Sequence, residues 1–404
     1  MWDTEEVRPS SNKKIYIALG IILLLLLAAG CFFLFPFSFA GQPVLQFSKR
    51  QPSVIASKTY VNAGETLALT GDSTGFWRIC QKDGAVTANR FDFSGNTVWV
   101  GEYGLTEPIW DINGQQVVLA NKQGGQVYLL THSRGLNQTL TVDGKPQIVA
   151  AAETGHFLIS YIPNQDQSTT LKPILSYYSP DGSVLFNTSL DNAIPLMAKV
   201  NQNGTQIFVV ISKVGLGGIE NFLISYSDNG QILWTSPLPT GAPAGMAIKP
   251  FGDRLAIAVD KLILLYSGAG QLLWQSSAQG TIQDMAFVGQ GDQLVYSGQK
   301  VSVLSFQKQS MLTSLSPDGT TLWQKQLKGD VPSLTGGTSA LSVFLANERG
   351  IHDLGSDGKL RWSYGLSSDP KAKAPLSVRI TVNGDGSAVL VQLSDGRMFV
   401  LRGE

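Results

Sequence analysis

Short runs of apolar residues alternate with polar turns along most of the chain, and one phrase recurs. A glycine is followed four residues later by tryptophan, or once by phenylalanine, at Gly95–Trp99, Gly182–Phe186, Gly230–Trp234, Gly270–Trp274, Gly319–Trp323 and Gly358–Trp362. In phrases such as FDFSGNTVW and YSDNGQILW, an apolar strand leads into a glycine turn and then into a second strand that reaches an aromatic residue. The pattern predicts a repeated β-hairpin.

The spacing of the hairpins predicts the architecture. The turn glycines fall at 95, 135, 182, 230, 270, 319 and 358, so the intervals run from 39 to 49 residues, which fits four short strands per unit. Units of this kind are typical of propeller blades. We therefore predict an all-β chain with a single propeller of four-stranded antiparallel blades. We expect eight blades, with seven as the alternative because the units before Gly95 and at Gly135 are degenerate; Thr139 stands where other units carry tryptophan.

The two ends of the predicted propeller complete each other. Three candidate strands, SVRITV (377–382), SAVLVQL (387–393) and RMFVLR (397–402), precede the end of the sequence. A fourth strand is needed to close the ring, and SVIASKTYV (53–61) is the natural donor, because pairing the two ends removes open edges. The propeller is thus expected to occupy residues 53–404.

An uncharged apolar segment lies near the N-terminus. Residues 15–39, within a charge-free run from Ile15 to Ala40, are long enough to span a bilayer as a helix. Lys13 and Lys14 precede them, which favours a cytoplasmic tail at 1–14, although Lys49 and Arg50 weaken the contrast. The expectation is a single-pass signal anchor in the cell membrane, a linker at 40–52 and an extracytoplasmic propeller.

A secretory signal with a lipid attachment site is a second interpretation of the same segment. Small residues precede Cys31 in Leu27-Ala28-Ala29-Gly30-Cys31, so Cys31 could carry a diacylglycerol group after cleavage. The apolar FFLFPFSFA that follows Cys31 differs from the polar tether expected of a lipoprotein, and favours an uncleaved helix.

Composition excludes some classes of protein. The chain has 30 Lys plus Arg and 30 Asp plus Glu, so it lacks the basic excess expected of a nucleic-acid-binding protein. Its second cysteine, Cys80, lies in the apolar stretch FWRIC and is expected to be a buried core thiol, so no disulfide framework is predicted.

The recurring aromatic residues have a structural interpretation. A large ring once per blade is expected to fill the wedge between adjacent blades, because rings spread around the circumference cannot converge on one ligand. The predicted blade-packing residues are Trp99, Phe186, Trp234, Trp274, Trp323 and Trp362.

The phrase, which recurs along residues ~90–400, resembles the repeat of pyrroloquinoline-quinone (PQQ) type propellers, the superfamily of quinoprotein alcohol dehydrogenases and their non-enzymatic relatives. The layout is also similar to the propeller lipoprotein of the bacterial outer-membrane β-barrel assembly machinery. Trp-Asp-repeat propellers fit less well. The resemblance implies the fold and says little about function, because the repeated residues are packing residues.

Catalytic and metal-binding patterns are missing from the sequence. The dehydrogenase branch of that family requires an adjacent cysteine pair, which this chain lacks. Asp181, Asp228, Asp318 and Asp357 precede turn glycines, where Asp stabilises the turn. The histidines (His132, His156 and His352) are scattered, and Asn383-Gly-Asp385-Gly-Ser387 lacks the terminal acidic ligand of a calcium loop. We predict no catalytic residue, cofactor or metal.

These observations favour a protein-interaction scaffold in the cell envelope. Binding of a protein or peptide is expected through loops such as 163–173, 212–221 and 307–311, since loops held by a rigid frame carry much recognition. The alternatives are a sensor that binds a small molecule or polysaccharide in the central funnel, and a quinoprotein-type enzyme. The sequence does not specify the partner, the face used or the oligomeric state.

Overall fold

The computed structural model divides the chain into two compact units, Met1–Val44 and Leu45–Glu404. It describes residues 52–59, 64–114, 116–133, 135–164, 172–215, 217–249, 254–289, 293–301, 308–328, 331, 333–336, 342–347, 350–366, 378–382 and 386–403. The predicted tail 1–14, membrane helix 15–39, Cys31 and all but the last residue of the linker 40–52 lie outside these ranges. Among the described residues, no helix is long and apolar enough to cross a membrane.

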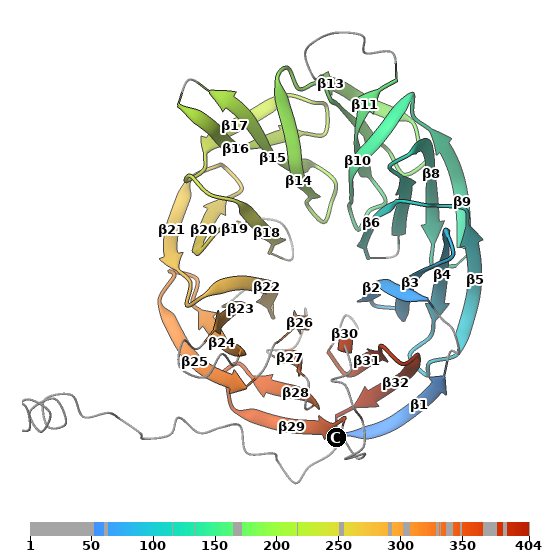
Figure 1. Ribbon diagram of the computed structural model, residues 1–404, viewed down its shortest axis with the longest axis vertical. Helices are drawn as coiled ribbons and strands as arrows, with labels where there is room; N and C mark the ends of the chain where they lie inside the picture. The colour runs from blue at the N-terminus through green and yellow to red at the C-terminus, as the bar shows by residue number, and fades with distance from the viewer. Residues whose placement is uncertain are drawn as a thin grey trace, which may run out of the picture. The chain divides into compact units, whose positions relative to one another are not determined.

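The described part of the second unit is a ring of eight sheets, each with four antiparallel strands (Figure 1). The predicted all-β propeller with eight blades is therefore confirmed, and the alternative of seven blades is wrong. From the centre of the ring outward, the strands of blades 1 to 7 follow one another in chain order (Figure 1).

Each blade has four strand positions, from innermost to outermost, and each position is occupied by eight strands, one from each of blades 1 to 8. The innermost strands are β2 (Glu65–Gly71), β6 (Pro108–Asn113), β10 (Gly144–Ala151), β14 (Ala193–Val200), β18 (Pro243–Ile248), β22 (Thr281–Val288), β26 (Ser333–Gly336) and β30 (Val378–Val382). The second strands are β3 (Phe76–Lys82), β7 (Gln116–Asn121), β11 (Phe157–Pro163), β15 (Gln206–Gly215), β19 (Arg254–Val259), β23 (Gln293–Val301), β27 (Ser342–Asn347) and β31 (Ala388–Leu393).

The third strands are β4 (Ala85–Phe91), β8 (Gly124–Thr131), β12 (Ile174–Tyr178), β16 (Gly218–Ser227), β20 (Leu262–Ser267), β24 (Lys308–Leu315), β28 (Gly350–Gly355) and β32 (Arg397–Arg402). The outermost strands are β5 (Thr97–Tyr103), β9 (Gly135–Thr141), β13 (Val184–Ser189), β17 (Ile232–Pro237), β21 (Leu272–Ser277), β25 (Thr321–Lys328), β29 (Leu360–Gly365) and β1 (Ser53–Thr59).

Burial within a blade explains the two sequence patterns. Every residue of the second strand β31 is buried, and its sequence AVLVQL is nearly continuous in apolar residues. The outermost strands β13, β17 and β21 alternate between exposed and half-buried positions, as expected for strands with one face in solvent. The hydrophobic periodicity therefore distinguishes interior strands from rim strands.

The hydrophobic core lies between blades. One cluster joins Trp77 and Ile79 of blade 1 to Val117 and Leu119 of blade 2. Another joins Phe76 and neighbouring residues of blade 1 to blade 8. Because each blade is apolar on both faces, burial requires a neighbour on each side, and the ring supplies one.

The closing blade combines both ends of the chain. Strand β1 pairs antiparallel with β32, from Ser53 opposite Arg402 to Thr59 opposite Arg397, in the sheet order β1-β32-β31-β30. The prediction that the N-terminal segment donates the missing strand is confirmed. The chain joins the ring at the end of the closing blade where β32 finishes.

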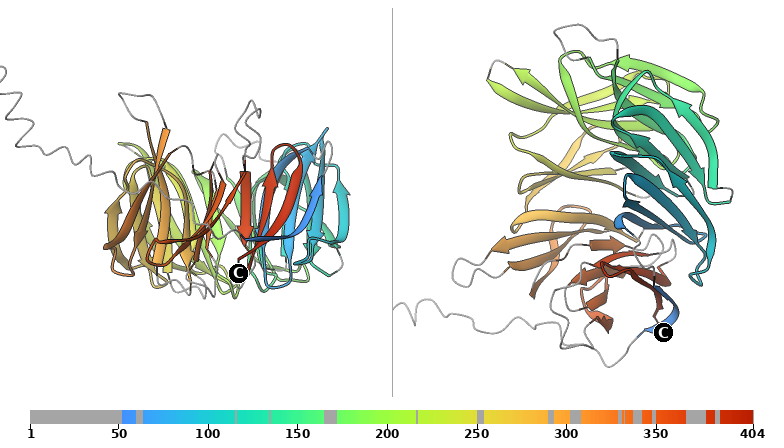
Figure 2. Two further views of the ribbon diagram at one scale, coloured as in Figure 1. Left: turned by 90° about the horizontal axis from the view of Figure 1, so that it is seen from below. Right: turned by 45° about the vertical axis from the view of Figure 1, so that its right-hand side comes forward.

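The ring has two different faces, because strand direction alternates within each blade (Figure 2). The turns between strands one and two and between strands three and four lie on one face, which we call the turn face. The connections between strands two and three, and from one blade to the next, lie on the other, which we call the loop face. Ser53, at the start of β1, lies at the turn face because it pairs with the last residue of β32.

Candidate functional site

Four tryptophans of the outermost strands bridge neighbouring blades through a hydrogen bond. Their indole N–H donates a hydrogen bond to a backbone carbonyl in the strand three to four turn of the next blade. The pairs are Trp99 Nε1 to His132 O (3.1 Å), Trp234 Nε1 to Gly268 O (2.9 Å), Trp274 Nε1 to Pro317 O (3.0 Å) and Trp323 Nε1 to Ser356 O (2.7 Å). The repeated residue is thus a polar link as well as an apolar ring.

The turn glycines supply the surface on which these rings lie. Gly319 has φ of +83°, a backbone conformation that L side chains rarely adopt, and a Cβ there would lie 2.7 Å from the Trp274 ring. Gly270 and Gly358 meet Trp234 and Trp323 of the preceding blades in the same way. The glycine and the aromatic residue of the phrase therefore meet across the boundary between successive blades.

Blade 2 departs from this pattern. Gln138 of β9 pairs with Leu129, the register position that Phe186 holds opposite Tyr177 in blade 3. A Cβ on Gly182 of the next blade would lie 2.5 Å from the Gln138 amide nitrogen. The interpretation that Thr139 replaces the aromatic residue is wrong: the hairpin is one residue shorter, and Gln138 occupies the position.

Blade 1 contains a buried ion pair that the sequence does not reveal. Arg90 Nη2 lies 2.8 Å from Asp72 Oδ1, and both side chains are almost fully buried. Asp72 also accepts a hydrogen bond from Trp77 Nε1 at 3.2 Å, and the Arg90 guanidinium lies 5.1 Å from the Trp77 ring centroid. Buried charges are tolerated when they are paired in this way, so this cluster has a structural role.

Two aspartates connect the innermost strands of different blades. Asp111 of β6 accepts hydrogen bonds from Ala151 N on β10 and from Lys199 Nζ on β14, both at 2.9 Å. Asp284 of β22 accepts one from Leu334 N on β26 at 3.1 Å. Burial raises the pKa of Asp284 to about 6, and hydrogen bonds from backbone N–H groups partly oppose the rise. Both carboxylates bind backbone N–H groups of other strands, and Asp111 also binds a lysine side chain, so their geometry is that of structural links.

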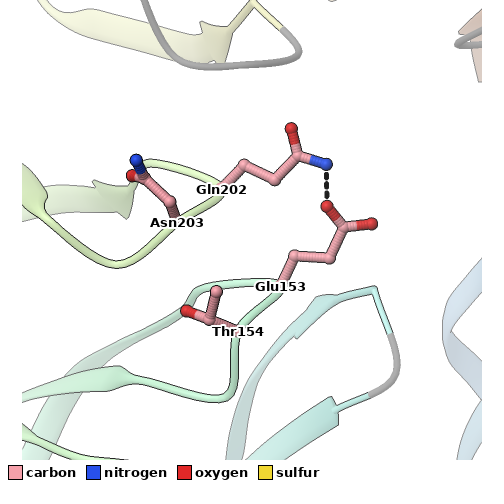
Figure 3. A pocket seen from close by; sticks show the side chains of 4 residues that line it. All are labelled: Glu153, Thr154, Gln202 and Asn203. Carbon is pink, nitrogen blue, oxygen red and sulfur yellow. Dashed lines mark hydrogen bonds between the residues drawn. The ribbon is translucent and has the colours of Figure 1, made fainter.

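A polar pocket of about 290 Å³ opens on the turn face between blades 3 and 4. Glu153 and Thr154 of the β10–β11 turn line it together with Gln202 and Asn203 of the β14–β15 turn. Figure 3 shows the Gln202 and Glu153 side chains directed toward each other, and the Gln202 amide donates a hydrogen bond to the Glu153 carboxylate. Lost hydration raises the pKa of Glu153, and the charge of Asp72 adds to the rise. The pocket offers amide, hydroxyl and carboxylate groups suited to a small polar molecule.

Blade 7 has two adjacent buried titratable residues. Burial raises the pKa of Asp353 to about 7 and lowers the pKa of His352 to about 4. Because consecutive residues of a strand point to opposite faces of the sheet, the two side chains do not form an acid–base pair. Lost hydration favours the neutral form of each group, as expected in a packed interior, and the charge of Arg361 partly opposes the rise at Asp353.

The acidic residues before the turn glycines bind their own turns. Asp318 accepts hydrogen bonds from Ser316 and Thr320, and Asp181 accepts them from Ser179 and Ser183, which lowers the pKa of each carboxyl group. The N–H of Lys359 does the same for Asp357.

The described residues show no assembled metal or nucleophile site. No group of three His, Cys, Asp or Glu side chains in the described ranges is placed to hold a metal ion. Cys80 is a buried free thiol, as predicted, and burial raises its pKa. His132 contributes its backbone carbonyl to the Trp99 bond, and His156 contacts Thr154 Oγ1 at 3.0 Å. Asn383 and Asp385 lie outside the described residues.

The longest strand pair of the ring projects from the loop face. Strands β15 and β16 have ten residues each and stay paired as far as Gly215 opposite Gly218. The prediction of a loop over all of 212–221 is therefore wrong, because residues on both sides of the turn continue to pair. Likewise, residues 308–311 of the predicted loop 307–311 belong to β24, while 165–171 of the loop 163–173 lie outside the described residues.

Two family models match different parts of the chain. Residues 78–232 match a family of unknown function (DUF5711), and residues 221–402 match the family described as outer membrane protein assembly factor BamB. Among curated proteins, no sequence matches this chain.

Solved structures match nearly the whole ring. The crystal structure of BamB from Moraxella catarrhalis aligns with a TM-score of 0.51 and 11% identity, covering 87% of this chain and 99% of that one. The C-terminal WD40 domain of Sif2 aligns with a TM-score of 0.54 and 13% identity, covering 89% and 99%. At these identities the structural matches show the fold alone. Together with the family match, they support a PQQ-type propeller similar to BamB.

Proposed function

We propose that this protein is a membrane-anchored, extracytoplasmic scaffold that binds a protein partner through the loop face of its propeller. The observation that carries the proposal is the β15–β16 hairpin, which continues past its blade and exposes apolar side chains at its end. Packing within the ring does not account for this extension. Rigid frames with projecting segments commonly use those segments for recognition.

The anchoring half of the proposal rests on the sequence. Residues 15–39 are long and apolar enough to span a bilayer, and 13 residues (40–52) separate them from β1. At most ~3.3–3.6 Å per residue, that linker reaches roughly 45 Å. Strand β1, which follows the linker in sequence, begins at the turn face, opposite to the face that carries the β15–β16 tip.

The proposal of a protein partner draws on the match to the BamB family. BamB is described as an outer membrane protein assembly factor, so a protein partner in the cell envelope is the corresponding role for this chain. PQQ-type propellers also include enzymes, and fold alone does not separate the two. We propose binding without catalysis, because the described polar clusters serve the ring itself.

The turn-face pocket favours one alternative function. Its volume of about 290 Å³ and the carboxylate, amide and hydroxyl groups of its lining residues suit a small hydroxylated or amine-bearing molecule, which a sensor would bind. This alternative predicts that Glu153→Gln abolishes binding of such a molecule, which isothermal calorimetry would measure against the wild-type protein.

A capture experiment with intact cells tests location and binding together. The full chain, tagged at its C-terminus, is treated with a membrane-impermeant lysine crosslinker and purified from solubilised membranes. We expect a discrete protein adduct, because the propeller and its partner are both exposed outside the cytoplasm. Residues 1–52 fused to an unrelated tagged domain are the control. Recovery of nothing above this control would contradict the proposal.

A further inference from the structure

The end of the β15–β16 hairpin is a free two-stranded ribbon. Pairing of β15 with β14 ends at Lys213, and pairing of β16 with β17 ends at Phe222. Beyond these positions, Val214 and Gly215 pair only with Ile219 and Gly218 of their own hairpin. We call Val214 and Ile219 the hairpin tip. Neither the inner nor the outer strand of the blade supports it.

The hairpin tip is apolar and exposed. Val214 is 86% exposed and Ile219 69%, the two highest values among the exposed large apolar side chains of the described residues. They are directly opposed in the antiparallel register, so both side chains lie on one face of the ribbon. Because neither belongs to a core cluster, they add little to the stability of the ring, and their exposure indicates an interaction surface.

The charge pattern favours a protein groove over a lipid surface. Lys213 and Glu220, which precede and follow the tip, are opposed in register and leave it without net charge. Residues 212–221 include no aromatic residue and a single basic one. Surface segments that bind bilayers combine apolar area with basic and aromatic side chains, and this tip has the apolar area without a basic cluster or an aromatic residue.

The position of the tip supports the same conclusion. It lies on the loop face, whereas Ser53, the first residue of β1, lies at the turn face. The tip and the start of β1 therefore lie on opposite faces of the ring, so a partner protein can reach the tip without contacting the start of β1.

We propose that Val214 and Ile219 insert together into an uncharged apolar groove of the partner protein. The inference rests on the proposed function and names the contact within it. Burying two aliphatic side chains that are otherwise in water gives affinity that changes little with salt, because no net charge is involved.

Binding of matched variants tests the contact. The captured partner is purified, and its Kd is measured for the full-length wild type, Val214→Ser/Ile219→Ser and Ile232→Ser. Ile232 is 60% exposed on the rim strand β17 and is the matched control. We expect the double variant to weaken binding by roughly 10- to 100-fold with an unchanged melting temperature, and Ile232→Ser to bind as the wild type does.

Three outcomes overturn the inference. Equal Kd values for wild type and double variant would remove the tip from the interface while leaving the scaffold role intact. If only Ile232→Ser weakens binding of the partner, the contact lies on the rim strand β17 and not at the hairpin tip. The third outcome is insertion of the tip into lipid. A Val214→Cys variant in a Cys31→Ala background is labelled with an environment-sensitive dye and placed in nanodiscs. Quenching of the dye by brominated lipid would show that the tip enters the bilayer. Unchanged dye emission is the expected result.

Discussion

Deletion of β1, residues 53–59, is expected to prevent stable closure of the ring. Six register pairs between β1 and β32 would be lost, and at ~0.5–1.5 kcal/mol for each backbone hydrogen bond the loss is roughly 3–9 kcal/mol. The third strand of blade 8 would become an open edge, which invites aggregation. We expect a melting temperature at least ~10 °C lower and concentration-dependent light scattering.

A side-chain variant of β1 distinguishes loss of its backbone pairing from loss of its exposed apolar side chains. Val54 and Ile55 are exposed, so Val54→Ser/Ile55→Ser should leave the melting temperature nearly unchanged while the backbone pairing remains. If the deletion melts like the wild type, the two ends of the chain do not hold the ring together.

Replacement of Trp274 by Ala is expected to destabilise the protein by ~3–5 kcal/mol. The ring packs on Gly319 of the next blade, and its Nε1 donates to Pro317 O at 3.0 Å. Trp274→Phe keeps most of the ring and loses the bond, so it should cost only ~0.5–1.5 kcal/mol. Phe186 at the corresponding position of blade 3 shows that a phenyl ring fits there. Urea unfolding measures both values.

The two Trp274 variants also test the polar link. A Phe variant as unstable as the Ala variant would mean that the N–H bond dominates, and an Ala variant with an unchanged unfolding midpoint would exclude any packing role. Gly319→Ala in the Trp274→Ala protein is the matched control, because removing the indole leaves only the cost of the positive φ.

The sequence predicts the ring well because its signals are local and periodic. A turn glycine such as Gly270 adopts positive φ, and the outermost strand that follows it, which includes Leu272, alternates between exposed and half-buried residues. The turn and the strand are therefore both recognisable from a few neighbouring residues. The donor strand at Ser53 could be inferred because three strands at the other end require a fourth.

Contacts between distant segments could not be predicted in this way. Asp111 and Lys199 are 88 residues apart, and no local pattern joins them. Gln138 was missed because a hairpin shortened by one residue shifts the register without changing the composition. Residues 212–221 are predicted as a loop, although the residues on both sides of the turn keep pairing as strands. The indole bond of Trp99 depends on the position of the next blade, which the sequence does not specify.

Photocrosslinking from the two faces of the ring tests the central claim most directly. A photoreactive amino acid is placed at Glu220 beside the hairpin tip, or at Asn203 beside the turn-face pocket, in the full-length protein in its native membrane. Both positions are exposed, so their reactivity is comparable. A loop-face scaffold predicts a discrete protein adduct from position 220 and none from position 203. An adduct from position 203 alone would contradict it.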